Sequence, residues 1–477
     1  MALLPLAAAA AGGRVGEYEA QQLVAAGLTL LGRCAPLVRA LSGRRSAILL
    51  PTSPAFLTAL AASEGRGAVL INPLAAPPEI AHQLADANVG AVFTIGALAS
   101  RLPPGVPRVL LDDAPRGARW LDGGASRDID LGTHFGLDLA GESDAPGRDE
   151  EAAIVYTSGM AGVPLGAILS HRALLANARA TVEAAALTPD DRTLAVLPFS
   201  HLFGLTVTLA APLLAGGTVL PAERFSPARA VEAIARDGVT VLVGVPAVIM
   251  ALLQVIERRG GALRDSALRL CLCGGAVLPA EVQDRWHEAT GVELRQGYGL
   301  TEAGPVCLFN RVQLPNHRGT LGVPFPGVEL SIRDPASGAA LPAGDTGEIW
   351  VAGDNLFSGY VRGGEQGLHC EGRWLRTGDL ASADAEGFVT FRGLLKAMFT
   401  RSGFNIYPAE IARVAMAMPG VRAARVRAIP NPARENDIAL EVAGDVEEGA
   451  VRRWCEERLS AYKQPTEVSV TRGAARA

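Results

Sequence analysis

The chain has 477 residues, 49% hydrophobic and 19% charged, which is enough apolar material for sizeable cores and too little charge for disorder. The net charge of −5 and the pI near 5.9 give no indication of a nucleic-acid partner or an anionic membrane surface. We expect no membrane span, because no run of about 18 apolar residues occurs. The N-terminal apolar run lacks the basic start of a signal peptide, and the scattered cysteines predict a reducing, cytoplasmic compartment.

Helix-like and strand-like segments alternate through the first part of the chain. Helices are predicted at residues 17–40, 54–65 and 77–87, and strands at 46–50, 68–71 and 91–95. Such alternation is typical of parallel βαβ units. Residues 114–149, rich in Asp, Gly and Arg, are predicted to form a loop.

The most informative stretch is residues 152–171, AAIVYTSGMAGVPLGAILSH. Its apolar start predicts a buried strand, which leads into a segment rich in hydroxyls and glycines at residues 157–166. Two interpretations are open for that segment. It is either a loop whose backbone N–H groups and hydroxyls bind phosphate, or an ordinary turn. It is not the common P-loop, because no Gly-Lys-Ser/Thr sequence closes it.

The alternation then resumes and gives way to two regions of different character. Helices are predicted at residues 172–186, 227–237 and 246–257, and strands at 193–197, 239–243 and 268–273. Cys271 and Cys273 lie in the last of these strands without a partnering Cys/His pair, so we expect core residues rather than a metal site. From residue 319 short strands separated by Gly and Pro turns predict a β-rich subdomain, and the last region predicts a small α+β domain.

Six segments carry a resemblance to a known family. They are residues 157–166, 198–204 (PFSHLFG), 274–276 (GGA), 296–302 (QGYGLTE), 374–379 (WLRTGD) and 402–410 (SGFNIYPAE). In this order they resemble the adenylate-forming superfamily of AMP-dependent synthetases and ligases, in the form seen in bacterial fatty acyl-CoA synthetases. The resemblance implies an α/β fold. It has a large N-terminal region of βαβ subdomains plus a β-rich subdomain at residues 1–393, a hinge at 394–397, and a small mobile α+β lid domain at 398–477.

The same resemblance implies the chemistry of a site. Tyr298 is expected to pack on adenine and Asp379 to accept hydrogen bonds from the ribose hydroxyls. Thr301 is expected to donate to the α-phosphate and Glu302 to bind Mg²⁺, while His201 lines the acyl pocket near the carboxylate. The catalytic residues implied are Thr157, Glu302 and His201. The other nucleotide-binding residues implied are Ser158, Gly159, Gly162, Gly274, Gly275, Ala276, Gln296, Gly297 and Gly299, and the other acyl-pocket residues are Phe203, Gly204 and again Gly299.

Taken singly, each of these residues also has an ordinary structural explanation. A surface acid, a core aromatic, a turn-capping carboxylate or a satisfied buried histidine would account for them one at a time. The occurrence of all these residues together, in the order that the family has them, favours a ligand site.

Several family positions are altered in this sequence. In the phosphate loop the usual Thr-Thr pair is Met160-Ala161 and the usual Lys is Leu165, while at the hinge the usual Arg is Leu394 and the usual Asp is Ala397. The sequence also stops before the segment in which the family carries its adenylation Lys. Lys463 corresponds to an earlier position and is a poor substitute. Losing one positioned cation or donor typically costs about 10²–10³ in rate.

The sequence therefore predicts an AMP-forming ligase that activates an apolar carboxylic acid as an acyl-adenylate and passes it to CoA or a carrier phosphopantetheine thiol, with ATP and Mg²⁺. Two alternatives remain open. One is a non-catalytic binding homologue that carries an acyl or nucleotide ligand. The other is an acyltransferase that takes a preformed acyl-adenylate and delivers the acyl group to a thiol or an amine.

Overall fold

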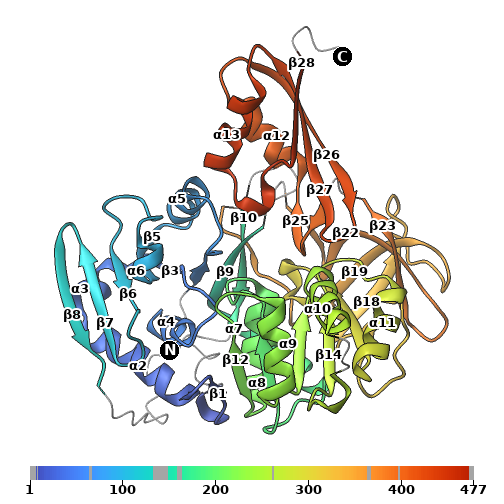
Figure 1. Cartoon of the computed structure of the whole chain (residues 1–477), viewed down its shortest axis with the longest axis horizontal. Helices are drawn as coiled ribbons and strands as arrows, with labels where there is room; N and C mark the ends of the chain where they lie inside the picture. The colour runs from blue at the N-terminus through green and yellow to red at the C-terminus, as the bar shows by residue number, and fades with distance from the viewer. Residues whose placement is uncertain are drawn as a thin grey trace.

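The computed structural model describes residue 7 and residues 9–63, 67–132, 149–157, 164–259, 263–362, 367–395 and 398–471. A broad body formed by the N-terminal and central parts of the chain carries the smaller C-terminal part above it (Figure 1). Buried apolar residues of the body form two clusters, and the C-terminal part has a separate cluster of its own. The chain is thus α/β, as its alternating pattern predicts.

The first sheet of the body combines strands from residues 45–170 with one strand, β20, from later in the chain. In spatial order its strands are β20 (Gly359–Tyr360), β10 (Leu165–Ser170), β9 (Glu151–Thr157), β4 (Ala68–Leu70), β3 (Arg45–Ile48), β5 (Val89–Thr94), β6 (Arg108–Leu110), β7 (Gly117–Asp122) and β8 (Ala125–Asp130). The strands from β9 to β6 are parallel, and α4 (Ala55–Ala62) and α5 (Pro77–Asp86) connect them. These are the βαβ units predicted for this region.

The second sheet carries the central part of the chain. In spatial order its strands are β17 (Val323–Pro324), β16 (Val306–Phe309), β15 (Leu294–Gly299), β14 (Leu270–Cys273), β13 (Val241–Gly244), β11 (Arg192–Ala195), β12 (Thr218–Pro221), β1 (Arg14–Val15) and β2 (Tyr18–Glu19). Its helices are α7 (His171–Ala184), α8 (Ala211–Leu214), α9 (Pro227–Arg236), α10 (Pro246–Arg258) and α11 (Ala280–Thr290), with a π-helix, η1 (Phe203–Ala210). The central strands β13 and β14 are buried along their whole length, as expected where helices cover both faces of a sheet.

A third, antiparallel sheet forms the β-rich part of the body. Its strands are β18 (Val328–Arg333), β19 (Gly347–Gly353), β22 (Trp374–Ala383), β21 (Cys370–Glu371) and β23 (Val389–Leu394), the last paired with β22. The C-terminal part contains the hairpin β24 (Phe399–Arg401) and β25 (Phe404–Ile406), a sheet of β26 (Val421–Asn431), β27 (Glu435–Gly444) and β28 (Glu467–Thr471), and helices α12 (Pro408–Met416) and α13 (Glu448–Arg458). The hinge at residues 394–397 stays a prediction, and Lys396 and Ala397 lie outside the described residues.

Two predicted elements differ from the structure. The helix predicted at residues 17–40 is two helices, α2 (Ala20–Arg33) and α3 (Ala35–Leu41), which meet at Cys34 with a bend of 89°. The segment predicted as a loop at 114–149 contains the hairpin of β7 and β8. Ala118 and Trp120 on β7 are buried, whereas β8 is almost wholly exposed and polar. An exposed edge strand lacks the apolar alternation from which strands are predicted.

No single helix among the described residues is both long and apolar enough to cross a membrane, and only the bent pair of α2 and α3 meets those criteria together. All six cysteines are free, with Cys370 exposed and the others buried. Cys271 and Cys273 lie within β14 with at most 2% of their surface exposed, which agrees with their prediction as core residues.

Candidate functional site

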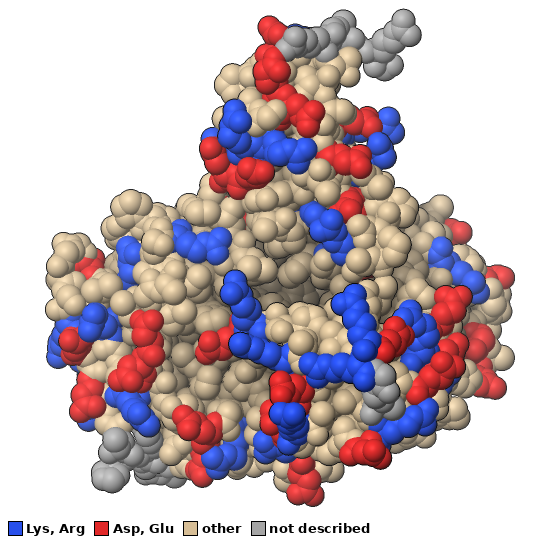
Figure 2. Space-filling model, viewed as in Figure 1, with Lys and Arg blue, Asp and Glu red and all other residues tan. Residues whose placement is uncertain are grey.

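A cavity of about 730 Å³ lies where the body and the C-terminal part meet. In the space-filling view, the molecule is hollowed below the C-terminal part, and Lys and Arg side chains lie along the rim of the hollow (Figure 2). The cavity is lined from the first sheet by residues such as Thr157, from the second sheet by residues 297–302, and from the C-terminal part by residues 402–405. Segments far apart in the sequence therefore share one site.

Tyr298 and Asp379 form one end of this site. Tyr298 lies on β15 and lines the cavity, and its hydroxyl donates to Asp379 Oδ2 on β22 at 2.6 Å. Burial and the nearby Asp379 carboxylate raise the pKa of Tyr298 well above its usual value. Asp379 is only 5% exposed and does not itself line the cavity. The carboxylate thus meets the cavity through Tyr298.

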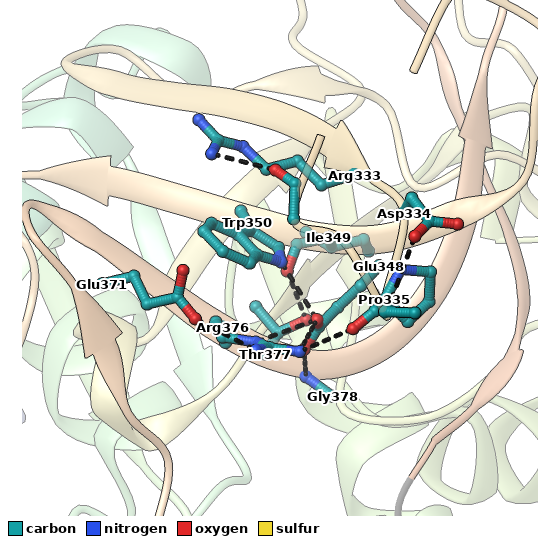
Figure 3. A network of polar contacts seen from close by, with 12 residues as sticks. Arg333, Asp334, Pro335, Glu348, Ile349, Trp350, Glu371, Arg376, Thr377 and Gly378 are labelled. Atoms are coloured by element: carbon teal, nitrogen blue, oxygen red, sulfur yellow. Dashed lines mark hydrogen bonds and ion pairs between the residues drawn. The ribbon is translucent and has the colours of Figure 1, made fainter. Parts of the chain in front are cut away.

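A polar network holds the backbone beside Asp379 (Figure 3). Glu348 on β19 is 2% exposed and accepts hydrogen bonds from Arg376 Nη2 at 2.9 Å, Trp350 Nε1 at 3.0 Å and the Gly378 N–H at 3.0 Å. Thr377 donates to the Ile349 carbonyl and accepts from the Asp379 N–H. A buried carboxylate is stable when its lone pairs are satisfied in this way. The network fixes the segment that ends in Asp379.

Glu302 is the buried carboxylate at the cavity wall. It lies in a short 3-10 helix, η3 (Thr301–Ala303), is 6% exposed, and accepts a 2.8 Å hydrogen bond from the Tyr360 hydroxyl. Among the described residues no cluster of three or more His, Cys, Asp or Glu side chains could hold a metal by itself. One buried carboxylate at the wall of this cavity does fit Mg²⁺, which commonly takes one or two carboxylates and fills its other positions with phosphates and water.

Glycine is required where β15 enters η3. A Cβ on Gly299 would lie 1.7 Å from the Pro305 carbonyl oxygen, so any other residue would displace the backbone there. Gly299 and Thr301 both line the cavity. The close packing holds the backbone of this segment against the cavity, next to Glu302.

His201 and Phe203 line another part of the cavity, just before and at the start of η1. The Phe203 N–H donates to His201 Nδ1 at 3.2 Å, which makes Nδ1 an acceptor and leaves Nε2 as the N–H of a neutral ring. The His201 side chain is exposed to the cavity, yet the surrounding protein withdraws it from bulk water, and this lowers the pKa of the imidazole. His201 is therefore a neutral donor near pH 7.

Much of the remaining lining is apolar. It includes Val207, Phe225, Val248, Leu272, Phe309 and Phe325 from the second sheet, its helices and the segments around them. The cationic residues among the described lining are Arg434 and Lys463, and both bind carboxylates. Arg434 Nε lies 2.8 Å from Asp437 Oδ1.

Lys463 joins the C-terminal part to the body. Its ammonium is 2.8 Å from Glu79 Oε1 on α5 and 2.7 Å from Glu410 Oε1 on α12. The Ser460 hydroxyl also donates to Glu79. Burial alone would lower the pKa of Lys463, but the Tyr462 side chain and the two carboxylates raise it above its usual value. Lys463 stays charged and is held by both partners.

The backbone of the C-terminal part also packs on the body. Gly403 follows β24 with φ of +78°, and a Cβ there would lie 2.8 Å from Val245. The Gly403 carbonyl faces Gly275, which itself lines the cavity. The loop at residues 402–404 thus lies over the site.

Most of the residues predicted for the site line this one cavity. They are Thr157, His201, Phe203, Gly274, Gly275, Gly297, Tyr298, Gly299, Thr301 and Glu302. Gly204, Ala276, Gln296 and Asp379 are not in its lining, and Ser158, Gly159 and Gly162 lie outside the described residues. Gly204 instead packs against the backbone, since a Cβ added at this position would lie 2.0 Å from the Pro198 carbonyl oxygen.

The altered family positions lie beside the same site. Leu165 begins β10 directly opposite Thr157 on β9, and Leu394 ends β23 directly opposite Asp379 on β22. Sequence reasoning missed Tyr360, Glu348 and Glu79, which bind Glu302, Arg376 and Lys463 respectively. None of the three stands in a diagnostic segment, so only the fold reveals their partners.

Comparison with known proteins places these features in context. Residues 29–361 match the model of the AMP-binding enzyme family. Feruloyl-CoA synthase from Amycolatopsis sp is 32% identical over 450 residues, 90% of this chain and 85% of that protein. A malonyl-CoA ligase solved with methylmalonyl-CoA and AMP is 29% identical, with a TM-score of 0.79 over 98% of this chain and 96% of that one. ATP-bound MatB from Rhodopseudomonas palustris is 27% identical, with a TM-score of 0.67 over 98% and 92%.

Proposed function

Because this chain belongs to the AMP-binding enzyme family, among the acyl- and aryl-CoA ligases, we propose that it activates an apolar carboxylic acid as an acyl-adenylate and transfers the acyl group to a thiol. ATP and CoA are the substrates that this family uses with the acid. The carrier-protein thiol, Mg²⁺ and the nature of the acid are parts of the proposal.

One observation carries the proposal, namely that a single cavity joins polar groups suited to a nucleotide with an apolar wall. Tyr298 would pack on adenine. For the ribose hydroxyls to reach the Asp379 carboxylate, ligand binding would have to open the Tyr298–Asp379 contact, because Asp379 does not line the cavity. Glu302 would hold Mg²⁺, which reduces the repulsion between the two anions that react. Thr157 and Thr301 would donate to phosphate oxygens, and neutral His201 would donate to the acid's carboxylate.

The acid is proposed to be apolar because the described lining offers no cation for a second acidic group. Its two cationic residues, Arg434 and Lys463, are already bound to carboxylates. A second carboxylate or a sulfonate on the substrate would lie against Val207, Leu272 or Phe309 without a partner, which costs several kcal/mol on the scale of about 2–7 for a buried polar group. Fatty and aryl acids avoid that penalty.

A second candidate function is an acyltransferase that starts from a preformed acyl-adenylate. Leu165 and Leu394 favour it, because neither can neutralise phosphate charge.

Mass spectrometry of the products distinguishes the candidates. The protein is incubated with ATP, Mg²⁺, CoA and a panel of fatty, aryl and dicarboxylic acids, beside reactions that supply synthetic acyl-adenylate instead of ATP and acid. Acyl-AMP and acyl-CoA from apolar acids are expected, and dicarboxylic acids are expected to fail. If only the synthetic adenylate yields thioester, the acyltransferase replaces the ligase. If no reaction yields product, both fail in favour of a binding homologue.

A further inference from the structure

We propose that Arg362 supplies the cation that neutralises the pyrophosphate leaving group, in place of a lysine on the phosphate loop. The proposal rests on the proposed ligase function. In that reaction a carboxylate oxygen attacks the α-phosphorus of ATP and forms a new P–O bond. The bond from the α-phosphorus to the bridging oxygen breaks, and pyrophosphate leaves with the electron pair. A cation at the leaving group stabilises the charge that develops there.

Strand register places Arg362 next to the position where the lysine is absent. On β10 and β20, Ala167 pairs with Tyr360, and the Val361 N–H donates to the Gly166 carbonyl at 3.0 Å. Arg362 follows Val361 in the turn after β20, so its backbone lies near the start of β10, where Leu165 stands. Leu165 is itself paired with Thr157 on β9. Arg362 therefore lies just past the end of β20, close to the paired residues Thr157 and Leu165.

Neighbours of Arg362 on both strands reach the cavity wall. Tyr360, two residues before Arg362, lines the cavity, and so does Thr157, which is paired with Leu165. Arg362 itself is not in the lining, so its side chain has to turn from Asp86 to reach a ligand in the cavity.

Arg362 is bound by an ion pair in which the guanidinium is the exposed partner. Its Nε lies 2.8 Å from Asp86 Oδ1, and the Arg362 side chain is 69% exposed while that of Asp86 is 14% exposed. The Tyr156 hydroxyl donates to the same carboxylate at 2.7 Å, and Tyr156 lines the cavity beside Thr157. Exposed ion pairs contribute little to stability, whereas Arg binds phosphate oxygens through two parallel N–H groups. Pyrophosphate would therefore compete successfully with Asp86 for the guanidinium.

The two cations of the described lining, Arg434 and Lys463, are worse placed for this role. Lys463 is 8% exposed and held between two carboxylates, and Arg434 pairs with Asp437 within the C-terminal part. Moving Lys463 to the phosphates would leave Glu79 without its charged partner at the domain junction. Arg362 can reorient at much lower cost.

The test removes the cation at position 362 and supplies one at position 165 instead. Four variants are compared with the wild type: Arg362→Ala, Leu165→Lys, the double variant, and Arg236→Ala as control. Arg236 is similarly exposed, at 75%, and is ion-paired with Glu232 on α9. The measurements are ATP–pyrophosphate exchange with the best acid of the panel and calorimetric binding of magnesium pyrophosphate alone.

Arg362→Ala is expected to lower exchange about 100-fold and pyrophosphate affinity about tenfold. Adding Leu165→Lys is expected to recover most of both losses, while Leu165→Lys alone changes them less than about threefold because Arg362 is already present. Thioester formation from synthetic acyl-adenylate is expected to stay unchanged in every variant, since no pyrophosphate takes part.

Wild-type exchange and pyrophosphate binding in Arg362→Ala would overturn the proposal, and so would equal losses in exchange and in thioester formation. Failure of the double variant to recover would also overturn it. These results differ from failure of the ligase function, in which the wild type forms no acyl-AMP from any acid. The binding measurement remains decisive for Arg362 in that case.

Discussion

The two ends of the cavity are built in different ways. At the end formed by β15, η3 and β22, the polar groups are buried and bound to other buried groups, as Tyr298 is to Asp379 and Glu302 to Tyr360. At the end formed by β9 and β10, the residue opposite Thr157 is the aliphatic Leu165, and the exposed Arg362 follows in the turn after β20. One end is a preorganised network, and the other depends on a movable side chain.

The two ends are expected to differ in how well they tolerate substitution. A buried carboxylate cannot be relocated without leaving its partners unsatisfied, which costs about 1–3 kcal/mol for each group and more for a charged one. A long cationic side chain at the edge of a sheet needs only a backbone position within its reach of the ligand. An aliphatic residue at position 165 is therefore compatible with the proposed ligase function in a way that an uncharged residue at position 302 is not.

Substitution of Glu302 is expected to give the largest effect, because it removes a charged group from the buried end of the cavity. Glu302→Gln retains an acceptor for the Tyr360 hydroxyl but removes the charge that would bind Mg²⁺. Acyl-AMP formation should fall about 10³-fold, while the unfolding temperature changes little. Glu386→Gln, at an exposed turn, serves as the control. Equal activity of the two variants would remove Glu302 from the proposed site.

Lys463→Met is expected to give the next largest effect, because it weakens the junction that closes the cavity. Breaking a buried ion pair costs about 3–5 kcal/mol. Of the two pairs made by Lys463, only the one with Glu79 links the C-terminal part to the body, so only that pair contributes to holding the two together. Thioester formation from synthetic acyl-adenylate should therefore fall about tenfold to 100-fold, and small-angle X-ray scattering should show a larger radius of gyration.

Arg452→Met provides a matched control on α13, since Arg452 pairs with Glu448 and donates to the Pro465 and Thr466 carbonyls, all within the C-terminal part. It should leave both the scattering and the transfer rate at wild-type values. A Lys463→Met protein with unchanged dimensions and rate would show that the ion pairs with Lys463 do not hold the domains together.

The smallest effect is expected from the titration of His201. Burial lowers its pKa, so the neutral donor persists through neutral pH, and kcat/KM for the acid should be flat near pH 7. Below the lowered pKa it should fall about tenfold per pH unit. The unfolded state, with an ordinary pKa of about 6.5, binds more protons than the folded state below that pH. Stability therefore decreases as the pH falls through this region.

His201→Gln removes the titrating group while keeping an amide donor near the Nε2 position. The acid limb of the rate profile should flatten, and the stability loss below pH about 6.5 should diminish. An unchanged acid limb in this variant would assign the titration to another group, and His201 would then be a structural residue.

The site was partly predictable from the sequence because some of its contacts lie within short segments. Residues 296–302 and 374–379 each form a continuous strand or turn, so their order along the chain identified Tyr298, Glu302 and Asp379. The βαβ pattern was predictable because buried parallel strands are continuously apolar. The β7–β8 hairpin was not, because an exposed edge strand carries no such pattern.

Other features depend on contacts between residues far apart in the sequence. Glu79 lies 384 residues from Lys463, and Tyr360 lies 58 residues from Glu302. Neither pair has a local pattern, because a charge or a hydroxyl on a helix or strand indicates only that the residue is polar. Only the folded structure shows which residues they contact.

The sequence by itself determined the fold class and the family and named most of the polar residues that line the cavity, because those depend on local periodicity and on short motifs. Only the tertiary structure decided that Asp379 reaches the cavity through Tyr298, that Lys463 is held between Glu79 and Glu410, and that Arg362 pairs with Asp86 beside Tyr156. The physical reason is that electrostatic interactions act through space, so the charge of a side chain matters where the fold brings it and not where it stands in the chain.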